Sequence, residues 1–174
     1  MGKIDTSEWK EFVIGDLFKQ IIKPDVLHSR QVVECESGIP YVVRTKFNNG
    51  IKCYVEKRDN MKLSPGGVIS FGAENATFFY QERPFVSGRD IYYIDTQNLS
   101  GLVCIFLTAC LQPIARKYSY NNGLFPDLLR NEIILLPVCK DTGLPDWPYM
   151  ENYMRAILHS TEKTLSNLQL ILGS

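Results

Sequence analysis

The sequence predicts an α+β fold, in which a β-rich domain with a mixed or antiparallel sheet precedes a long C-terminal helix of the coiled-coil type. Residues 9–94 consist of short apolar runs separated by turn residues, a pattern typical of strands. The apolar spacing becomes helical near residue 98 and follows heptads after residue 146. At 174 residues, the chain has the length of one domain with an appended element.

Short strands are predicted in most of the domain because apolar residues cluster between Gly, Pro and Asn. Asn48-Asn49-Gly50 predicts a hairpin, since Asn and Gly tolerate the positive φ of tight turns. A helical turn is expected at residues 15–19, and residues 20–38 are expected to form a long loop. The strands are expected at residues 9–14, 39–45, 51–56, 68–71, 77–80, 85–86, 91–94 and 132–138.

A first helix is predicted from about residue 102, with one buried face. Asn98 or Ser100 can cap its start, and Pro113 kinks or ends it. A further helical turn is expected at residues 127–131. The apolar positions that predict the first helix are Leu102, Ile105, Phe106 and Ala109.

The last segment predicts a helix at residues 147–172, with Asp146 as its N-cap. Its apolar residues repeat in heptads, which favours pairing with another helix. Two interpretations stay open: the helix packs on its own domain, or it pairs with a helix of another molecule. The residues assigned to dimerisation are Met150, Met154, Ile157, Leu158, Leu165, Leu168, Ile171 and Leu172.

Composition argues against several classes of protein. Lys and Arg total 19, as do Asp and Glu, so binding of polyanions by bulk charge is not expected. The five cysteines form no C-x-x-C pair and only two histidines accompany them, so neither a metal site nor a disulfide framework is expected. The sequence shows neither a signal-peptide core nor an apolar run of membrane-spanning length. A reducing, cytoplasmic location is therefore expected.

Motifs of the enzymes that act on DNA are incomplete. A methyltransferase needs a glycine-rich cofactor loop and a polar-Pro-Pro-aromatic motif, and neither occurs. A restriction-type nuclease needs Pro-Asp followed by Asp/Glu-x-Lys, but Pro126-Asp127 and Pro145-Asp146 lack the lysine. We therefore predict a chain that is not an enzyme, with no catalytic residue, metal or cofactor. A small nuclease stays open as an alternative.

Positive charge gathers locally, with six Lys or Arg against Glu56 and Asp59 in residues 44–62. DNA readers combine cations and hydroxyls for phosphates with Arg, Asn and Gln for base edges. The loop around residues 72–81 and the stretch at 116–122 add small polar and aromatic groups. The competing interpretation is a set of ordinary turns and a solvated lysine face.

Each candidate DNA contact has an expected role. Cations are expected to contact phosphate or guanine, asparagines to contact base edges or backbone, and tyrosines to line a groove. Glu74 could accept a hydrogen bond from a cytosine amino group. The candidates are Arg44, Thr45, Lys46, Asn48, Asn49, Lys52, Arg58, Glu74, Asn75, Thr77, Tyr118, Tyr120 and Asn122.

Several short blocks, in this order, resemble the target-recognition domain of type I restriction-modification specificity (S) subunits. The first reads Glu8-Trp9-Lys10 and continues to Phe18, and another is Ile39-Pro40-Tyr41-Val42. The late block Tyr118-x-Tyr120 is followed by Ile133-x-Leu135-x-Pro137, and Pro145-Asp146-Trp147 matches the start of the family's conserved helix. The resemblance covers nearly the whole chain.

This resemblance implies a non-catalytic, sequence-specific DNA-binding subunit. It would direct adenine methyltransferase subunits, which use S-adenosylmethionine, and restriction subunits. A whole S subunit has two recognition domains and two long helices, whereas this chain has one domain (1–140) and one helix (146–172). Two organisations agree with this length: a half-subunit that forms a homodimer and reads one half of a bipartite site per copy, or one half of a longer protein. A protein-interaction module that uses the C-terminal helix is the further alternative.

Overall fold

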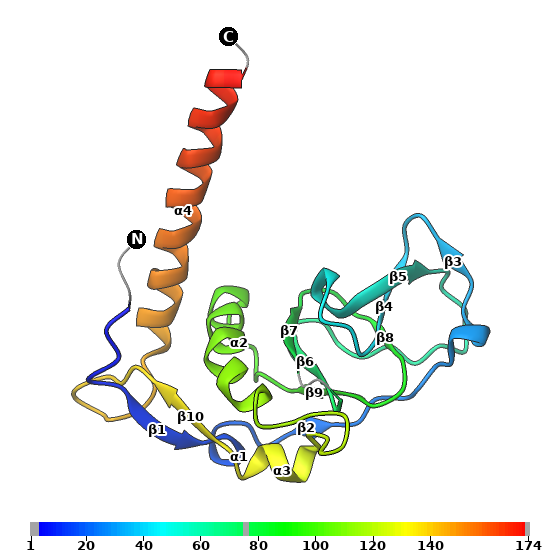
Figure 1. Ribbon diagram of the computed structural model, residues 1–174, viewed down its shortest axis with the longest axis horizontal. Coiled ribbons are helices and arrows are strands. Elements are labelled where there is room, and N and C mark those ends of the chain that lie inside the picture. Colours follow the sequence, from blue (N-terminus) through cyan, green and yellow to red (C-terminus); the bar gives the residue numbers. More distant parts are fainter. Residues whose placement is uncertain (1–3, 75–76, 173–174) are drawn as a thin grey trace.

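The computed structural model describes residues 4–74 and 77–172, and of Leu172 only the backbone. It confirms the predicted α+β fold, with small sheets, a central helix and a long C-terminal helix (Figure 1). The helices are α1 (Ile14–Leu17), α2 (Gly101–Ala115), α3 (Pro126–Arg130) and α4 (Trp147–Leu172), with 3-10 turns η1 (Ser29–Gln31) and η2 (Asn48–Gly50). The strands are β1 (Lys10–Val13), β2 (Ile21–Ile22), β3 (Glu34–Cys35), β4 (Ile39–Val42), β5 (Ile51–Val55), β6 (Val68–Gly72), β7 (Phe78–Gln81), β8 (Val86–Ser87), β9 (Ile91–Ile94) and β10 (Ile133–Leu136).

The described strands form three sheets, with strand orders β1-β10, β2-β9-β6-β7 and β3-β5-β4-β8. Antiparallel pairs dominate, and β4 pairs with β8 in parallel, which makes the third sheet mixed. Most predicted strands are confirmed within a few residues. The predicted loop at residues 20–38 is wrong, because it contains β2, η1 and β3. Strands of two residues are too short to show any periodicity, so the sequence pattern could not reveal them.

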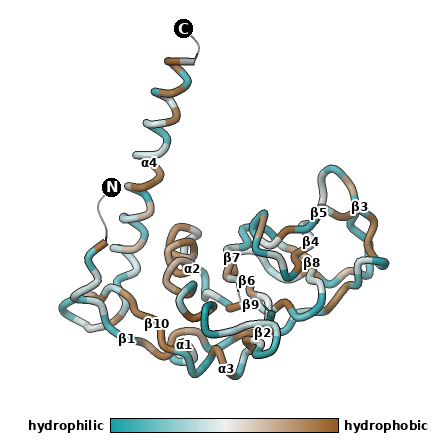
Figure 2. Tube along the Cα trace, viewed as in Figure 1, coloured by the Kyte–Doolittle hydropathy of each residue, from teal (hydrophilic) through white to brown (hydrophobic). Residues whose placement is uncertain are grey.

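The main core lies between the β2-β9-β6-β7 sheet and α2. Every residue of β6 is buried, and Ile69 and Phe71 share one apolar cluster with Leu107 and Leu111 of α2. Figure 2 shows the corresponding concentration of hydrophobic residues along α2. Burying one such side chain stabilises the fold by about 1.5–3 kcal/mol, so this contact orients the sheet and its loops.

The β4–β5 hairpin follows the predicted turn chemistry but has a longer connection. Asn48, Asn49 and Gly50 all adopt positive φ, at 48°, 53° and 77°. Residues 43–50 join the strands, so the hairpin is not a two-residue turn. A Cβ at position 50 would lie 3.1 Å from the Phe79 ring, so glycine serves both the backbone conformation and the close approach.

Helix α2 begins as predicted. The Ser100 Oγ accepts a hydrogen bond from the backbone N–H of Val103 at 3.4 Å, which makes Ser100 the N-cap. The helix ends at Ala115, two residues after Pro113. Proline in the last turn removes one intrahelical donor, which is tolerated there because the helix stops almost at once.

The long helix α4 has two parts with different surroundings. Its first turns pack on α2: Met150 is fully buried, and the Tyr153 ring meets the Phe106 ring edge-on at 5.8 Å. Beyond Ile157 the described side chains are exposed, and the helix projects away from the domain (Figure 1). Met150, which the heptad pattern assigned to dimerisation, therefore belongs to the core of its own chain. No helix in the described part of the chain is long and apolar enough to cross a membrane.

The N-cap of α4 gives a first testable prediction. The Asp146 Oδ1 accepts a hydrogen bond from the backbone N–H of Tyr149 at 2.9 Å, as expected of an N-cap. We expect Asp146→Ala to lower the free energy of unfolding by about 1 kcal/mol, measured by urea denaturation. Asp141→Ala, on the exposed loop before the helix, is the matched control and should change it far less. An equal loss in both variants would contradict the capping role.

Candidate nucleic-acid interface

Several loops meet at one end of the strands of the β2-β9-β6-β7 sheet, where β6 ends and both β7 and β9 begin. Gly72 pairs with Ile91 at this end. The backbone N–H of Ala73 donates to the Asp90 carbonyl at 2.9 Å, and that of Leu124 donates to the Ala73 carbonyl at 2.8 Å. We call this region the loop cluster; its described residues are 43–47, 72–74, 77, 88–90 and 118–125.

Arg44 is the charged residue at the centre of the loop cluster. Its Nη1 forms an ion pair with Glu74 Oε2 and lies 3.4 Å from Asp90 Oδ2. The side chains of the three residues are 27%, 28% and 23% exposed, respectively, so the ion pairs are shielded but reachable from solvent. Arg89 Nε lies 3.2 Å from the same Asp90 oxygen. Asp90 is not among the predicted contacts, because an Arg-Asp pair in a turn forms no recognisable motif.

A narrow pocket beside Arg44 brings together several of the predicted contacts. Thr45, Glu74 and Thr77 line it with Arg44. Lys46 and Phe47 follow on the same loop, and the Phe47 side chain is 80% exposed. An exposed aromatic beside exposed cations is the kind of group that stacks on or wedges against bases. The predicted contact Asn75 lies outside the described residues.

The hairpin asparagines are engaged with backbone groups. The Asn48 side-chain amide donates to the Ile51 carbonyl at 2.9 Å, and the Asn49 amide donates to the Tyr80 carbonyl at 2.8 Å. The Gln81 amide in turn donates to the Asn49 carbonyl at 2.9 Å. These contacts hold the hairpin in place and use one N–H of each amide, so base readout by either asparagine, which stays a prediction, would use the second N–H and the amide oxygen.

Lys52 lies on β5 in the β3-β5-β4-β8 sheet, and Arg58 follows that strand. Lys52 Nζ is 4.0 Å from a Glu34 carboxylate oxygen, and Arg58 Nη1 donates to the Gln31 carbonyl at 3.3 Å. These two cations thus have other partners than Arg44, which pairs with Glu74 and Asp90. The side chains of Lys52 and Glu34 are 49% and 64% exposed, so Lys52 stays accessible from solvent.

A partly buried hydrogen-bond group anchors the base of the turn at residues 118–122. One Glu132 oxygen accepts from the Tyr118 hydroxyl at 2.7 Å, and the other accepts from Lys117 Nζ at 2.6 Å. Tyr118 is therefore fixed and partly buried against the core, whereas Tyr120 is 75% exposed. The Asn122 backbone pairs with Ser119, which closes the turn and leaves Asn122 exposed.

The same group shifts two pKa values in opposite directions. Burial, followed by the Glu132 carboxylate, raises the pKa of Tyr118 to about 12. Burial alone would raise the pKa of Glu132, but hydrogen bonds from Lys117 and Tyr118 lower it overall. At neutral pH the Tyr118 hydroxyl is therefore neutral and Glu132 is a carboxylate. Among all the residues that the structure describes, no three His, Cys, Asp or Glu side chains are grouped so that they could hold a metal ion.

No protein-family model matches the chain. The chain is 27% identical over 158 residues to the specificity subunit S.BcgI of the type II restriction enzyme BgcI from Heyndrickxia coagulans. The match covers 90% of this chain and 46% of the relative, so the chain spans about half of that relative's length.

Solved structures share the fold. The type I restriction-modification S subunit from M. genitalium aligns with a TM-score of 0.60 and 15% identity, over 95% of this chain and 44% of that one. The HsdS subunit from Thermoanaerobacter tengcongensis aligns with a TM-score of 0.58 and 14% identity, over 98% and 41%. A chain from a structure on the assembly of the type I restriction-modification system aligns with a TM-score of 0.63 and 15% identity, over 98% of this chain and 43% of that one. The predicted resemblance to S subunits is confirmed, and the fold corresponds to about half of one.

The Glu132 group gives a prediction with a defined pH dependence. Because the folded pKa of Glu132 is below its ordinary 4.5, its carboxylate stabilises the fold above that pH, and this contribution is lost as the pH falls through the lowered pKa. We expect Glu132→Gln to lower the free energy of unfolding at pH 7 by about 1–2 kcal/mol. The difference from the wild type should shrink below pH 4.5. The measurement is urea denaturation at a series of pH values.

Glu162→Gln, on the exposed part of α4, is the matched control. Its unfolding free energy should follow the wild type at each pH. A Glu132→Gln protein with the same pH profile as the control would show that Glu132 does not anchor the turn.

Proposed function

We propose that the chain is the non-catalytic DNA-specificity subunit of a type I restriction-modification system, or one half of it. The observation that carries the proposal is similarity to a specificity subunit over 90% of the chain, together with the S-subunit fold. The curated relative belongs to a type II enzyme and the solved relatives to type I systems, so the fold supports the type I assignment and the sequence supports the role. The chain corresponds to one recognition domain and one conserved helix.

The loop cluster is the DNA-binding surface in this proposal. Lys46 and Arg89 offer exposed cations for phosphates, and Tyr120 and Phe47 offer exposed rings for the groove. The remaining predicted contacts surround this surface or extend it along the hairpin and β5. Because the net charge of the chain is zero, binding would depend on these few contacts and not on a broad positive face.

Catalysis in the proposed system belongs to other subunits. An adenine methyltransferase subunit would bind S-adenosylmethionine, and a restriction subunit would cut unmodified DNA in the cytoplasm. This chain would give both of these subunits their specificity for a DNA sequence. Its own residues would bind DNA and partners and would take no part in bond making or breaking.

The outer half of α4 supports a homodimer. On the heptad seam and beside it, Leu158, Leu165, Leu168 and Ile171 are between 45% and 69% exposed. The helix has 26 residues, so it is about 39 Å long at 1.5 Å per residue. Two helices paired antiparallel by a two-fold axis would hold two recognition domains about one DNA turn apart, which matches a bipartite site.

The proposal is tested by selection from a randomised pool of duplex DNA. We expect the full chain, alone or with its methyltransferase partner, to enrich a motif of two separated half-sites. Absence of enrichment under both conditions would reject the proposed function.

Lys46→Ala should weaken binding to all sequences alike and reduce the slope of log K against log salt by about one, as for a lost phosphate contact. Lys163→Ala, on the exposed part of α4, is the control and should bind like the wild type.

The dimer is tested by sedimentation of the intact chain at tens of micromolar. We expect the wild type to sediment as a dimer and the double variant Leu158→Glu/Leu165→Glu to be monomeric, since burying two carboxylates in a helix pair is unfavourable. Ser166→Glu lies on the opposite side of the heptad and should stay dimeric. A monomeric wild type would reject the homodimer while leaving the recognition domain untouched.

A further inference from the structure

We infer that Arg44 reads a guanine in the major groove, and that Glu74 and Asp90 are positioning residues that orient its guanidinium. The inference rests on the proposed function and deepens it, because it selects one specificity-determining residue from the loop cluster. It also changes the role expected for Glu74, from a cytosine contact to a residue that acts through Arg44.

The first support is the geometry of the Arg44 side chain. Both carboxylates approach the same nitrogen, Nη1, from loops that follow β6 and precede β9. The Nε and Nη2 groups form the other edge of the guanidinium, with two N–H groups pointing the same way. That edge matches the O6 and N7 acceptors of guanine, which arginine contacts in a bidentate manner.

The second support is the charge balance around Arg44. Arg44 and Arg89 carry two positive charges, and Glu74 and Asp90 carry two negative charges, so the group is neutral as a whole. Because both carboxylates lie beside Arg44, the positive charge of this side chain is already balanced, and it offers a phosphate little net attraction. The guanine edge is an uncharged acceptor, so its binding does not require a net positive charge. Electrostatics therefore favours a base over a phosphate at this position.

The third support is that the backbone is built to hold this side chain. A Cβ on Gly72 would lie 3.1 Å from Arg44 Cγ, so glycine makes room for the arginine stem at the end of β6. Asp90 adopts a positive φ of 57°, and its carbonyl is fixed by the Ala73 N–H. An arginine whose conformation is set before binding loses less side-chain entropy on contact with DNA.

The experiment repeats the selection from the randomised duplex pool with the full chain and three near-isosteric or charge-conserving variants. Arg44→Lys keeps the positive charge but loses the planar fork. Glu74→Gln and Asp90→Asn remove one negative charge each, and asparagine tolerates the positive φ at position 90. Glu82→Gln, an exposed carboxylate beyond β7, is the matched control. Thermal unfolding of each variant confirms that it is folded.

The expected result concerns one base pair of each half-site. Arg44→Lys should lose on the order of ten- to a hundredfold discrimination in favour of one G·C pair, with the other positions unchanged. Glu74→Gln and Asp90→Asn should reduce preference at that same pair by a smaller factor, and Glu82→Gln should retain the wild-type motif.

Other results would overturn the inference in distinct ways. If Arg44→Lys kept every base preference and weakened all sequences alike, Arg44 would be a phosphate contact. If Arg44→Lys lost the preference but both carboxylate variants kept it, the positioning role would be rejected. If the wild-type chain enriched no motif, the proposed function itself would fail, and the inference with it.

Discussion

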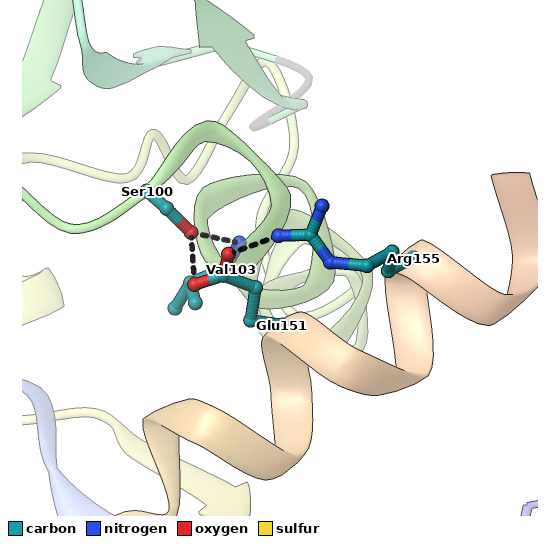
Figure 3. Close-up of polar contacts among 4 residues, drawn as sticks. All are labelled: Ser100, Val103, Glu151 and Arg155. Carbon is teal, nitrogen blue, oxygen red and sulfur yellow. Dashed lines mark hydrogen bonds and ion pairs between the residues drawn. The ribbon is translucent and has the colours of Figure 1, made fainter.

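The packing of α2 between the central sheet and α4 is the contact on which the rest of the molecule depends. One set of α2 side chains meets β6 and β7, and another meets the first turns of α4, so the helix is surrounded by apolar groups of its own chain. Polar contacts also fix how α4 is oriented relative to α2. Ser100 caps α2 and donates to Glu151 at 3.1 Å, and Glu151 accepts from Arg155 at 2.6 Å (Figure 3). The start of α4 is thereby fixed relative to the sheet, and so is the direction in which its outer half projects.

The loop cluster inherits its geometry from the same core. Strand pairing places the end of β6 beside the starts of β7 and β9. The hydrogen bonds of Ala73 tie the 118–125 turn to these strand ends. Charge is then arranged on a rigid base, with Arg44 held by carboxylates from two different loops. A surface built in this way can vary its loop side chains while the sheet and α2 stay the same, which would suit the proposed recognition of DNA.

Much of the fold could be predicted from the sequence, and the reasons for success and failure differ by element. Long periodic segments such as α4, and caps such as Ser100 and Asp146, follow local rules, and the structure confirms them. The short strands β2 and β3 depend on partners distant in sequence and were missed. The candidate site was likewise predicted only in part. The basic stretch was visible in the sequence, but the ion pairs of Arg44 are with residues thirty and forty-six positions away, which no local pattern indicates. Burial of Met150 likewise reflects tertiary packing that a heptad pattern cannot show.

The hydrogen bond from Asn49 to Tyr80 has a consequence for solubility. Strand β7 is at the edge of its sheet, where unpaired backbone groups can recruit a strand from another molecule. The Asn49 amide occupies the Tyr80 carbonyl at 2.8 Å, and the Gln112 amide of α2 occupies the Phe78 carbonyl at 3.3 Å. Two side-chain amides thus take the place of a neighbouring strand and protect this edge against aggregation. The hairpin that bears part of the candidate interface also closes the sheet behind it.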